Sequence, residues 1–235
     1  MQPSKPEPQR LYRQIAERLR SAILAGDYRP GARLPAERDL AQILGVSRPS
    51  VREALIALEV DGWVEVRTGS GVYVLERTPS ATELPASNEW GPLELIRARR
   101  LVEGETAALA AEYAQPTHLQ AMHLALAAMR ADADAGKAPL ESDRAFHTAL
   151  VQACGNSVLM DTVQGYWEAR HSPMFERLGN YFETPRSWRA AIDEHQAILS
   201  AIEARDAVAA RLAMHRHMDQ SHARLNASWV HGKAN

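Results

Sequence analysis

Four side chains in the second half of the chain have the residue types of a metal site: Asp143, His147, His195 and His217. Asp143 and His147 are four residues apart in a helical pattern, so their β-carbons lie about 5–6 Å apart and both side chains can reach one ion. His195 and His217 lie among the apolar residues of predicted helix faces, where a neutral imidazole needs a polar partner. A cation shared with a carboxylate would supply that partner. The simpler alternative is a set of core histidines that bond to backbone or water.

Arginines near the N-terminus form a second candidate group. Arg48 and Arg52 are four residues apart, on one side of a predicted helix and beside its apolar stripe, and Arg38 lies on the preceding predicted helix. An arginine fork can donate two hydrogen bonds to guanine O6 and N7, or it can clamp a phosphate. This placement favours DNA binding over the alternative of a solvated basic face.

The elements that would position these arginines are three helices and a hairpin. Apolar residues at helical spacing predict a first helix from Leu11 to Gly26, Pro35 begins a second, and Ser47 can cap a third. Two β-rich runs, residues 63–66 and 72–75, then form a hairpin across a glycine-bearing loop. Three helices and a wing in about 65 residues are the layout of a winged helix-turn-helix, whose third helix enters the major groove.

The rest of the chain is predicted to be helical. Residues 77–92 contain three prolines and no periodicity, which indicates a linker. Breaks at proline and glycine divide the remainder into helices near residues 93–113, 117–134, 140–153, 157–171, 185–204 and 206–228. The predicted fold class is therefore mainly α, with an N-terminal winged helix-turn-helix domain and a C-terminal all-α helical bundle. The predicted parts are a tail (1–10), the DNA-binding domain (11–76), the linker (77–92), the helical domain (93–228) and a second tail (229–235).

Composition limits the classes of protein that fit. The 235 residues are 46% hydrophobic and 24% charged, as in globular proteins. With 27 basic and 29 acidic residues, any DNA-binding surface must be local. The single Cys154 excludes an internal disulfide and a cysteine-rich zinc site. Because no apolar run approaches about 18 residues and the first ten residues lack an apolar signal core, the sequence predicts a cytoplasmic protein without membrane partners.

The motifs GDYRPGARLPAERDLA, GVSRPSVREAL and DGWVEVRTGSGVYV resemble the DNA-binding domain of the GntR family of bacterial transcription regulators, over residues 11–74. The resemblance implies that Arg38, Arg48 and Arg52 contact DNA and that Thr68 and Gly69 at the wing tip enter the minor groove. A glycine at that tip lets the backbone approach the groove floor. We add three neighbours of these residues to the predicted DNA-binding surface: Ser47, Ser50 and Arg67. For Arg67, an ordinary wing charge remains the alternative to a phosphate contact.

The runs SDRAFHTALVQACGNSVL and DEHQAILSAIEARDAVAARLAMHRHM resemble the all-helical, effector-binding FCD domain of the FadR branch of that family, over roughly residues 93–226. In metal-containing members, an aspartate and three histidines of these motifs bind a divalent ion. The chain has all four residues, at Asp143, His147, His195 and His217. Zinc is the first expectation, with nickel and manganese as alternatives. Such a ligand set leaves coordination positions open for an oxygen of an anion.

The effector is expected to be a small carboxylic acid. Arg99 and Glu103 match the Arg-x3-Glu pattern of the first FCD helix, so Arg99 either pairs with an effector carboxylate or forms a surface salt bridge with Glu103. Trp167, Arg170 and His171 are further candidates for the pocket, although Trp167 also suits the core. The runs EVRTGSGVYV and LYRQIA resemble hexuronate-utilisation repressors of this branch, which favours a sugar acid. Lactate, pyruvate, dicarboxylates and amino acids remain alternatives.

Together these features predict a metabolite-responsive transcription regulator, a repressor rather than an enzyme. It would bind a palindromic double-stranded DNA operator as a homodimer and respond to an organic acid bound at the metal. A metalloenzyme tethered to a DNA-binding head is a second hypothesis, but no further glutamate or histidine has the spacing of a general base. A third is a DNA-binding protein that needs no effector and uses the bundle only to dimerise.

Overall fold

The structure is a computed structural model that describes residues 10–76 and 90–226. Most of the predicted tails (1–10 and 229–235) and of the predicted linker (77–92) lies outside these residues. The chain divides into two compact units. The first contains the N-terminal part of the chain through Leu93 together with Ser172–Tyr181, and the second contains Glu94–His171 and Phe182–Asn226.

The first unit confirms the winged helix-turn-helix fold. Its elements are α1 (Leu11–Ala25), α2 (Glu37–Leu44), α3 (Arg48–Val60), β1 (Val64–Arg67) and β2 (Gly71–Val74). Gly26 and Gly45 end α1 and α2 with φ angles of 87° and 67°, which glycine adopts without steric cost. Ser47 caps α3 by accepting a hydrogen bond from the amide of Ser50 at 3.3 Å. The α1 and α3 helices pack against each other, so the third helix is held by a hydrophobic core.

The wing contains a third extended segment that the sequence interpretation treated only as a turn. Strands β1 and β2 are antiparallel, with Val66 opposite Val72. The amide of Leu34 donates to the carbonyl of Val72 at 2.8 Å, and Arg33 forms a bridge with Tyr73. The segment between α1 and α2 therefore pairs with β2 through an isolated bridge, beside the two-stranded sheet of the wing.

A helix between the two predicted breaks at Pro173 and Pro185 was missed from the sequence. This helix, α8 (Pro173–Phe182), begins at a proline, which is favoured in the first helical turn. It buries Met174 and Leu178, one turn apart. Most of α8 belongs to the first unit, where the hydroxyl of Tyr181 donates to Oε1 of Glu59 on α3 at 2.6 Å.

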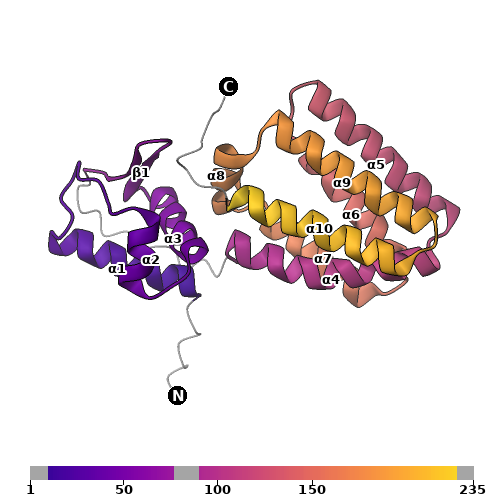
Figure 1. Cartoon of the computed structure of the whole chain (residues 1–235), viewed down its shortest axis with the longest axis horizontal. Helices are drawn as coiled ribbons and strands as arrows, with labels where there is room; N and C mark the ends of the chain where they lie inside the picture. The colour runs from indigo at the N-terminus through magenta and orange to yellow at the C-terminus, as the bar shows by residue number, and fades with distance from the viewer. Residues whose placement is uncertain (1–9, 77–89, 227–235) are drawn as a thin grey trace, which may run out of the picture. The chain divides into compact units, whose positions relative to one another are not determined.

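The second unit confirms the all-α bundle. Its helices are α4 (Pro92–Tyr113), α5 (Pro116–Asp134), α6 (Leu140–Gln152), α7 (Ser157–Ala169), α9 (Pro185–Glu203) and α10 (Ala207–Leu225) (Figure 1). The α9 and α10 helices pack side by side, α5 packs on both α6 and α9, and α6 packs on α7. Asn156 starts α7 by accepting from the amides of Val158 and Leu159, so its turn role is an N-cap.

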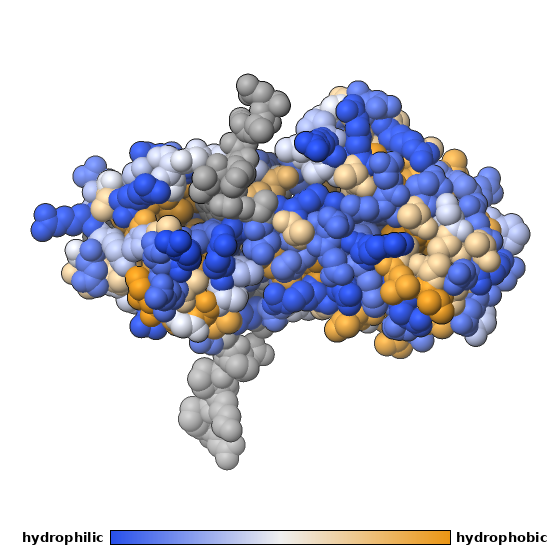
Figure 2. Space-filling model, in the orientation of Figure 1, coloured by the Kyte–Doolittle hydropathy of each residue, from blue (hydrophilic) through white to orange (hydrophobic). Residues whose placement is uncertain are grey.

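The surface in Figure 2 is mostly hydrophilic on the face in view, with hydrophobic residues in small separate patches. This distribution is expected where the apolar side chains are packed inside each unit. Within the described ranges, no helix combines the length and the apolar character that crossing a membrane requires.

Candidate functional site

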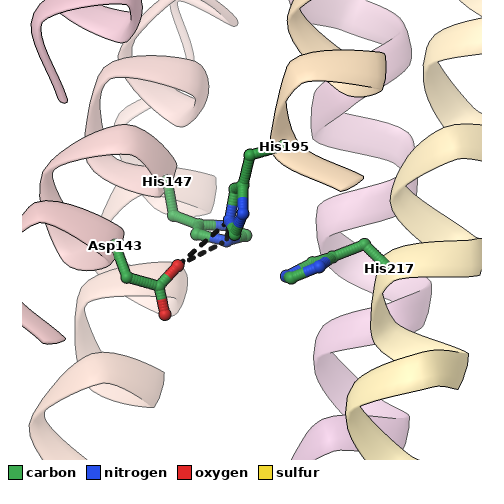
Figure 3. A group of neighbouring side chains, drawn as sticks. All are labelled: Asp143, His147, His195 and His217. Carbon is green, nitrogen blue, oxygen red and sulfur yellow. Dashed lines mark hydrogen bonds and ion pairs between the residues drawn. The ribbon is translucent and has the colours of Figure 1, made fainter. Parts of the chain in front are cut away.

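Three helices of the bundle bring the predicted metal ligands together. Asp143 and His147 come from α6, His195 from α9 and His217 from α10, and their side chains point toward one another (Figure 3). One donor atom from each residue can be chosen so that all four atoms lie within 4.8 Å of one another. The three histidines are buried, and Asp143 is 17% exposed. The cluster thus unites residues that are up to 74 positions apart, from 143 to 217.

Inside the cluster, side-chain nitrogen and oxygen atoms lie close enough together to bind one cation. Nε2 of His195 lies 3.0 Å from Oδ1 of Asp143, and Nε2 of His147 lies 3.4 Å from the same oxygen. The two Nε2 atoms are 3.1 Å apart. Oδ1 is buried, and no described residue hydrogen-bonds it with proper geometry. A buried carboxylate oxygen that faces two imidazole nitrogens fits a divalent metal ion.

The other ring nitrogen of each histidine is held from outside the cluster. Nδ1 of His195 donates to the carbonyl oxygen of Ala191 at 2.6 Å, and Nδ1 of His217 donates to Glu194 at 2.8 Å. Nδ1 of His147 forms an ion pair with Glu103. An acceptor at Nδ1 fixes the proton there and leaves the lone pair of Nε2 for a metal. The rings of His195 and His217 are therefore held by hydrogen bonds at Nδ1, whereas Glu103 lies against Nδ1 of His147 without the geometry of a hydrogen bond.

Charges around the cluster shift several pKa values. Burial by itself would raise the pKa of Glu103, but Arg99 and then His147 outweigh it and lower that pKa to about 2. Burial also acts to raise the pKa of Asp143, yet its close contacts with His147 and His195, and the charge of Arg170, hold it well below its usual range. Burial and the neighbouring His195 lower the pKa of His217 to about 3. Both carboxylates are thus ionised and His217 is neutral, as metal ligation requires.

The pKa of His147 moves in the other direction. Burial favours its neutral form, but the negative charge of Glu103 and a hydrogen bond to Asp143 outweigh burial and raise its pKa. In the metal-free protein, a proton therefore competes for the position between the two carboxylates.

The Arg99–Glu103 pair is buried, which corrects the alternative of a surface salt bridge. Arg99 is 4% exposed and Glu103 1% exposed, with Nε and Oε1 at 2.5 Å. Because Glu103 also contacts His147, it orients a ligand, a role that the sequence interpretation missed. Glu194 was missed as well, since nothing in its spacing indicates that it reaches His217 from the neighbouring helix.

Trp167 connects two charged pairs. It is buried in a hydrophobic cluster, and the guanidiniums of Arg99 and Arg170 lie 4.6 and 4.5 Å from its ring. Arg170 also donates to Oδ2 of Asp143 at 3.0 Å. Arg99 and Arg170 are thus next to the cluster, whereas the side chain of His171 is exposed.

In the first unit, most of the predicted DNA contacts are accessible. Arg38 and Arg48 have side chains that are 82% and 53% exposed. Arg52 differs from the prediction, because its side chain is 0% exposed and pairs with Glu37 of α2 at 2.6 Å. The sequence pattern placed Arg52 beside the apolar stripe but could not show that the neighbouring helix covers it.

The other predicted contacts lie at the start of α3 and on the wing. Ser47 is exposed and Ser50 half-buried, and their hydroxyl oxygens are 2.8 Å apart. Thr68 and Gly69 are exposed at the turn between the strands, where Gly69 has a φ of 76°. Arg67 is 53% exposed and pairs with Glu65 at 2.7 Å.

Comparisons with known proteins agree with both units. Residues 11–74 match the family described as bacterial regulatory proteins, gntR family, and residues 94–220 match the FCD domain. The chain belongs to the gntR family. Its FCD domain places it in the FadR branch, as the sequence motifs implied.

Relatives of this gntR regulator match over most of its length. The Uxu operon transcriptional regulator of Escherichia coli strain K12 is 38% identical over 225 residues, which cover 92% of this chain and 87% of the relative. The Exu regulon transcriptional regulator of the same strain is 38% identical over 222 residues, covering 92% and 84%. The solved structure of E. coli McbR/YncC is 25% identical with a TM-score of 0.52, covering 92% of this chain and 97% of that chain. The matched families and named regulators act in transcription and are not enzymes, in agreement with the sequence prediction.

Removing a ligand should remove the metal from the gntR regulator. We expect His147→Ala to lose zinc on elemental analysis, whereas Glu194→Gln, which only weakens the orientation of His217, lowers zinc affinity by about 10- to 100-fold. His123→Ala is the matched control, because His123 is 53% exposed and pairs with Glu203 away from the cluster. Full zinc occupancy in His147→Ala would contradict the ligand assignment.

Zinc affinity should fall on acidification as His147 takes up a proton, and Glu103 should influence the pH at which this happens. Because the pKa of His147 is raised, protons displace zinc at a higher pH than they would from an unperturbed histidine. Glu103→Gln removes the charge that raises this pKa, so the decline in affinity should begin at a lower pH. Zinc titrations against a competing chelator between about pH 5 and pH 8 measure this, and an unchanged profile would refute the coupling.

Proposed function

We propose that this gntR regulator is a metabolite-responsive repressor that binds a palindromic operator as a homodimer and is controlled by a small carboxylic acid. The observation that carries the proposal is the cluster of Asp143 with three buried imidazoles, whose donor atoms lie within 4.8 Å of one another and whose Nδ1 atoms each have a neighbour outside the cluster. Four ligands prepared in this way are costly to keep in a bundle core unless they bind a cation.

The metal would be held by Asp143, His147, His195 and His217. Zinc is the first candidate because imidazole and carboxylate are among its common ligands, and nickel and manganese are alternatives. A bound divalent ion supplies a Lewis acid that attracts anionic oxygen. Arg170 holds Oδ2 of Asp143, which leaves Oδ1 for the metal.

Charge balance favours an anionic effector. Three carboxylates near the cluster are each paired with a guanidinium: Glu103 with Arg99, Asp143 with Arg170, and Glu194 with Arg224. Each pair is neutral and an imidazole that binds a metal ion is neutral, so a bound divalent ion would bring two positive charges to a buried site. A carboxylate offsets part of that charge, which a neutral sugar or an amine would not do. The resemblance of LYRQIA and EVRTGSGVYV to hexuronate-utilisation repressors makes a sugar acid the first candidate.

DNA would be bound by the winged helix-turn-helix domain, with its proposed limits at residues 11–76. Arg38, Arg48, Ser47 and Ser50 would face the major groove and its phosphates, and Thr68 and Gly69 the minor groove. Arg67 would contact a phosphate. Arg52 would contribute only after it leaves Glu37, or it would act by holding α2 against α3.

The helix α8 offers a route from the helical domain, proposed to span residues 93–228, to the DNA-binding domain. Both of its ends continue into bundle helices, while Tyr181 donates to Glu59 on α3. The same oxygen of Glu59 accepts the amide of Val66 in the wing at 3.0 Å. A shift of α8 would therefore act on the end of the recognition helix and on the wing together.

Dimerisation would use the helical domain. Three apolar side chains on α4 and α10 are 53% to 65% exposed: Leu101, Val208 and Leu212. Arg211 on α10 pairs with Glu105 on α4 at 2.7 Å, so the two helices lie close together there. A second copy that covers these side chains would bring two DNA-binding domains to one operator. The protein would act in the cytoplasm, where the bacterial chromosome lies.

DNA affinity should depend on sequence and on an organic acid. We expect the zinc-loaded protein to select a palindromic duplex from random sequences, with Arg48→Ala losing about 1–3 kcal/mol on that duplex. Anisotropy titrations would then test a hexuronate, an aldonate, lactate, pyruvate and a dicarboxylate. An acid that weakens binding about 100-fold corresponds to about 2.7 kcal/mol of coupling. The same affinity for every acid would exclude this control, and the absence of a preferred duplex would exclude the operator.

The effect of the acid should require the contact of α8 with the recognition helix. We expect Tyr181→Phe to bind the selected duplex as the wild type does without acid, but to respond less to the active acid, because Glu59 loses its hydroxyl donor. Tyr113→Phe is the matched control, since Tyr113 is 56% exposed on α4. An undiminished response in Tyr181→Phe would refute this route.

A further inference from the structure

Arg33 lies beside the wing and is not among the predicted DNA contacts. The amide of Leu34 donates to Val72, and the amide of Val74 donates to the carbonyl of Ala32 at 2.9 Å, so the segment is fixed to β2 on both sides of Arg33. This backbone pairing makes Arg33 the bridge partner of Tyr73. Its position is therefore set by the sheet and not by a free loop.

The side chain of Arg33 lies on the polar face of the wing. Paired residues in an antiparallel sheet direct their side chains to the same face, and successive residues alternate. The valines of β1 and β2 form the buried face. The opposite face contains the bridge partners Arg33 and Tyr73 with Glu65, which is opposite Tyr73, and Arg67. Arg33 is exposed on this face.

The guanidinium of Arg33 is placed by Gly71, the first residue after the wing turn. A Cβ added to Gly71 would lie 2.5 Å from Nε and 3.1 Å from Cζ of Arg33. The guanidinium thus lies directly over the backbone of Gly71, whose φ of 126° favours glycine.

Arg33 also differs from the predicted contacts in its charge environment. Each of three exposed arginines on this domain has an acidic neighbour, namely Arg38 with Asp39, Arg48 with Glu37, and Arg67 with Glu65. Within residues 10–76 and 90–226, Arg33 has no hydrogen bond, ion pair or ring contact with another side chain. Its donors are thus available to an anion from outside the chain.

We propose that Arg33 is a further DNA-contact residue that binds a backbone phosphate beside the minor groove entered by the wing tip. Arg33 lies on the stem of the wing next to Gly71, which is two residues from Gly69 at the tip. Beside a tip that enters the minor groove, the DNA surface consists of sugar and phosphate. A guanidinium without an acidic neighbour, on a backbone segment that is paired to β2, is suited to a phosphate and carries no base preference from this position. The inference rests on the proposed DNA-binding function.

The test compares charge with packing at this residue. Arg33→Met keeps a long side chain against Gly71 and removes the charge, whereas Arg33→Lys keeps the charge. We expect Arg33→Met to bind the selected duplex and an unrelated duplex roughly three- to tenfold more weakly at about 0.15 M salt. The slope of log affinity against log salt should become less steep by about 0.9, and Arg33→Lys should keep the wild-type slope.

The matched control is Arg29→Met, which removes the same charge from the same turn. Arg29 is exposed, and the hydrogen bond it contributes within the turn comes from its main-chain oxygen. A wild-type affinity and slope in Arg33→Met would overturn the inference, as would an equal change in Arg29→Met, which would reflect net charge alone. Thermal unfolding of Arg33→Met should match the wild type; binding that is lost only together with stability would also overturn the inference. If the wild type itself prefers no duplex, the proposed function fails instead.

Discussion

The structure of the helical domain depends on fixing three buried imidazoles so that each presents the same ring nitrogen to the centre. A neutral imidazole has one donor and one acceptor, and the two exchange places when the tautomer changes. An outside acceptor at Nδ1 of His147, His195 and His217 removes that freedom. What remains is a buried carboxylate oxygen that the Nε2 atoms of His147 and His195 approach to 3.4 and 3.0 Å, with His217 close by, an arrangement that repels itself unless a cation or a proton lies between these atoms. The pKa of His147, raised despite burial, reflects this demand for positive charge.

The partners of these imidazoles explain why so many charged groups can be buried in one bundle. Glu103 and Asp143 would be unstable alone in a low-dielectric interior, but each is paired with an arginine that also lies against Trp167. The indole thus holds both guanidiniums in place without adding charge. Loss of any member of this group would leave a neighbour unpaired, so the ligands and their supports form one unit in energetic terms.

The sequence was sufficient for the fold class and for naming the four residues that the structure brings together, and it was insufficient wherever a partner comes from another helix. Asp143 and His147 were indicated by their spacing and His195 and His217 by their place on apolar helix faces, and the resemblance to the FCD domain then implied a shared role for all four. The roles of Glu103 and Glu194 depend on which turn of one helix faces which turn of the next, and periodicity carries no such information. The burial of Arg52 by Glu37 has the same origin. The missed helix α8 has a local cause instead: Pro173 was interpreted as a break, whereas proline in the first turn also starts a helix.

The position of α8 in the chain links the two halves of the proposed mechanism. Arg170 lies just before α8 and Glu183 just after it, and their side chains are 3.9 Å apart, so one guanidinium connects the two ends of the segment. The same guanidinium donates to Oδ2 of Asp143, one of the proposed metal ligands. A ligand that draws Asp143 or Arg170 into new contacts would therefore act on both ends of α8 at once. Between those ends, Tyr181 shares Glu59 with the wing, where a small displacement costs a buried hydrogen bond. Coupling through such a segment needs two discrete arrangements of one helix and no deformation of the bundle core.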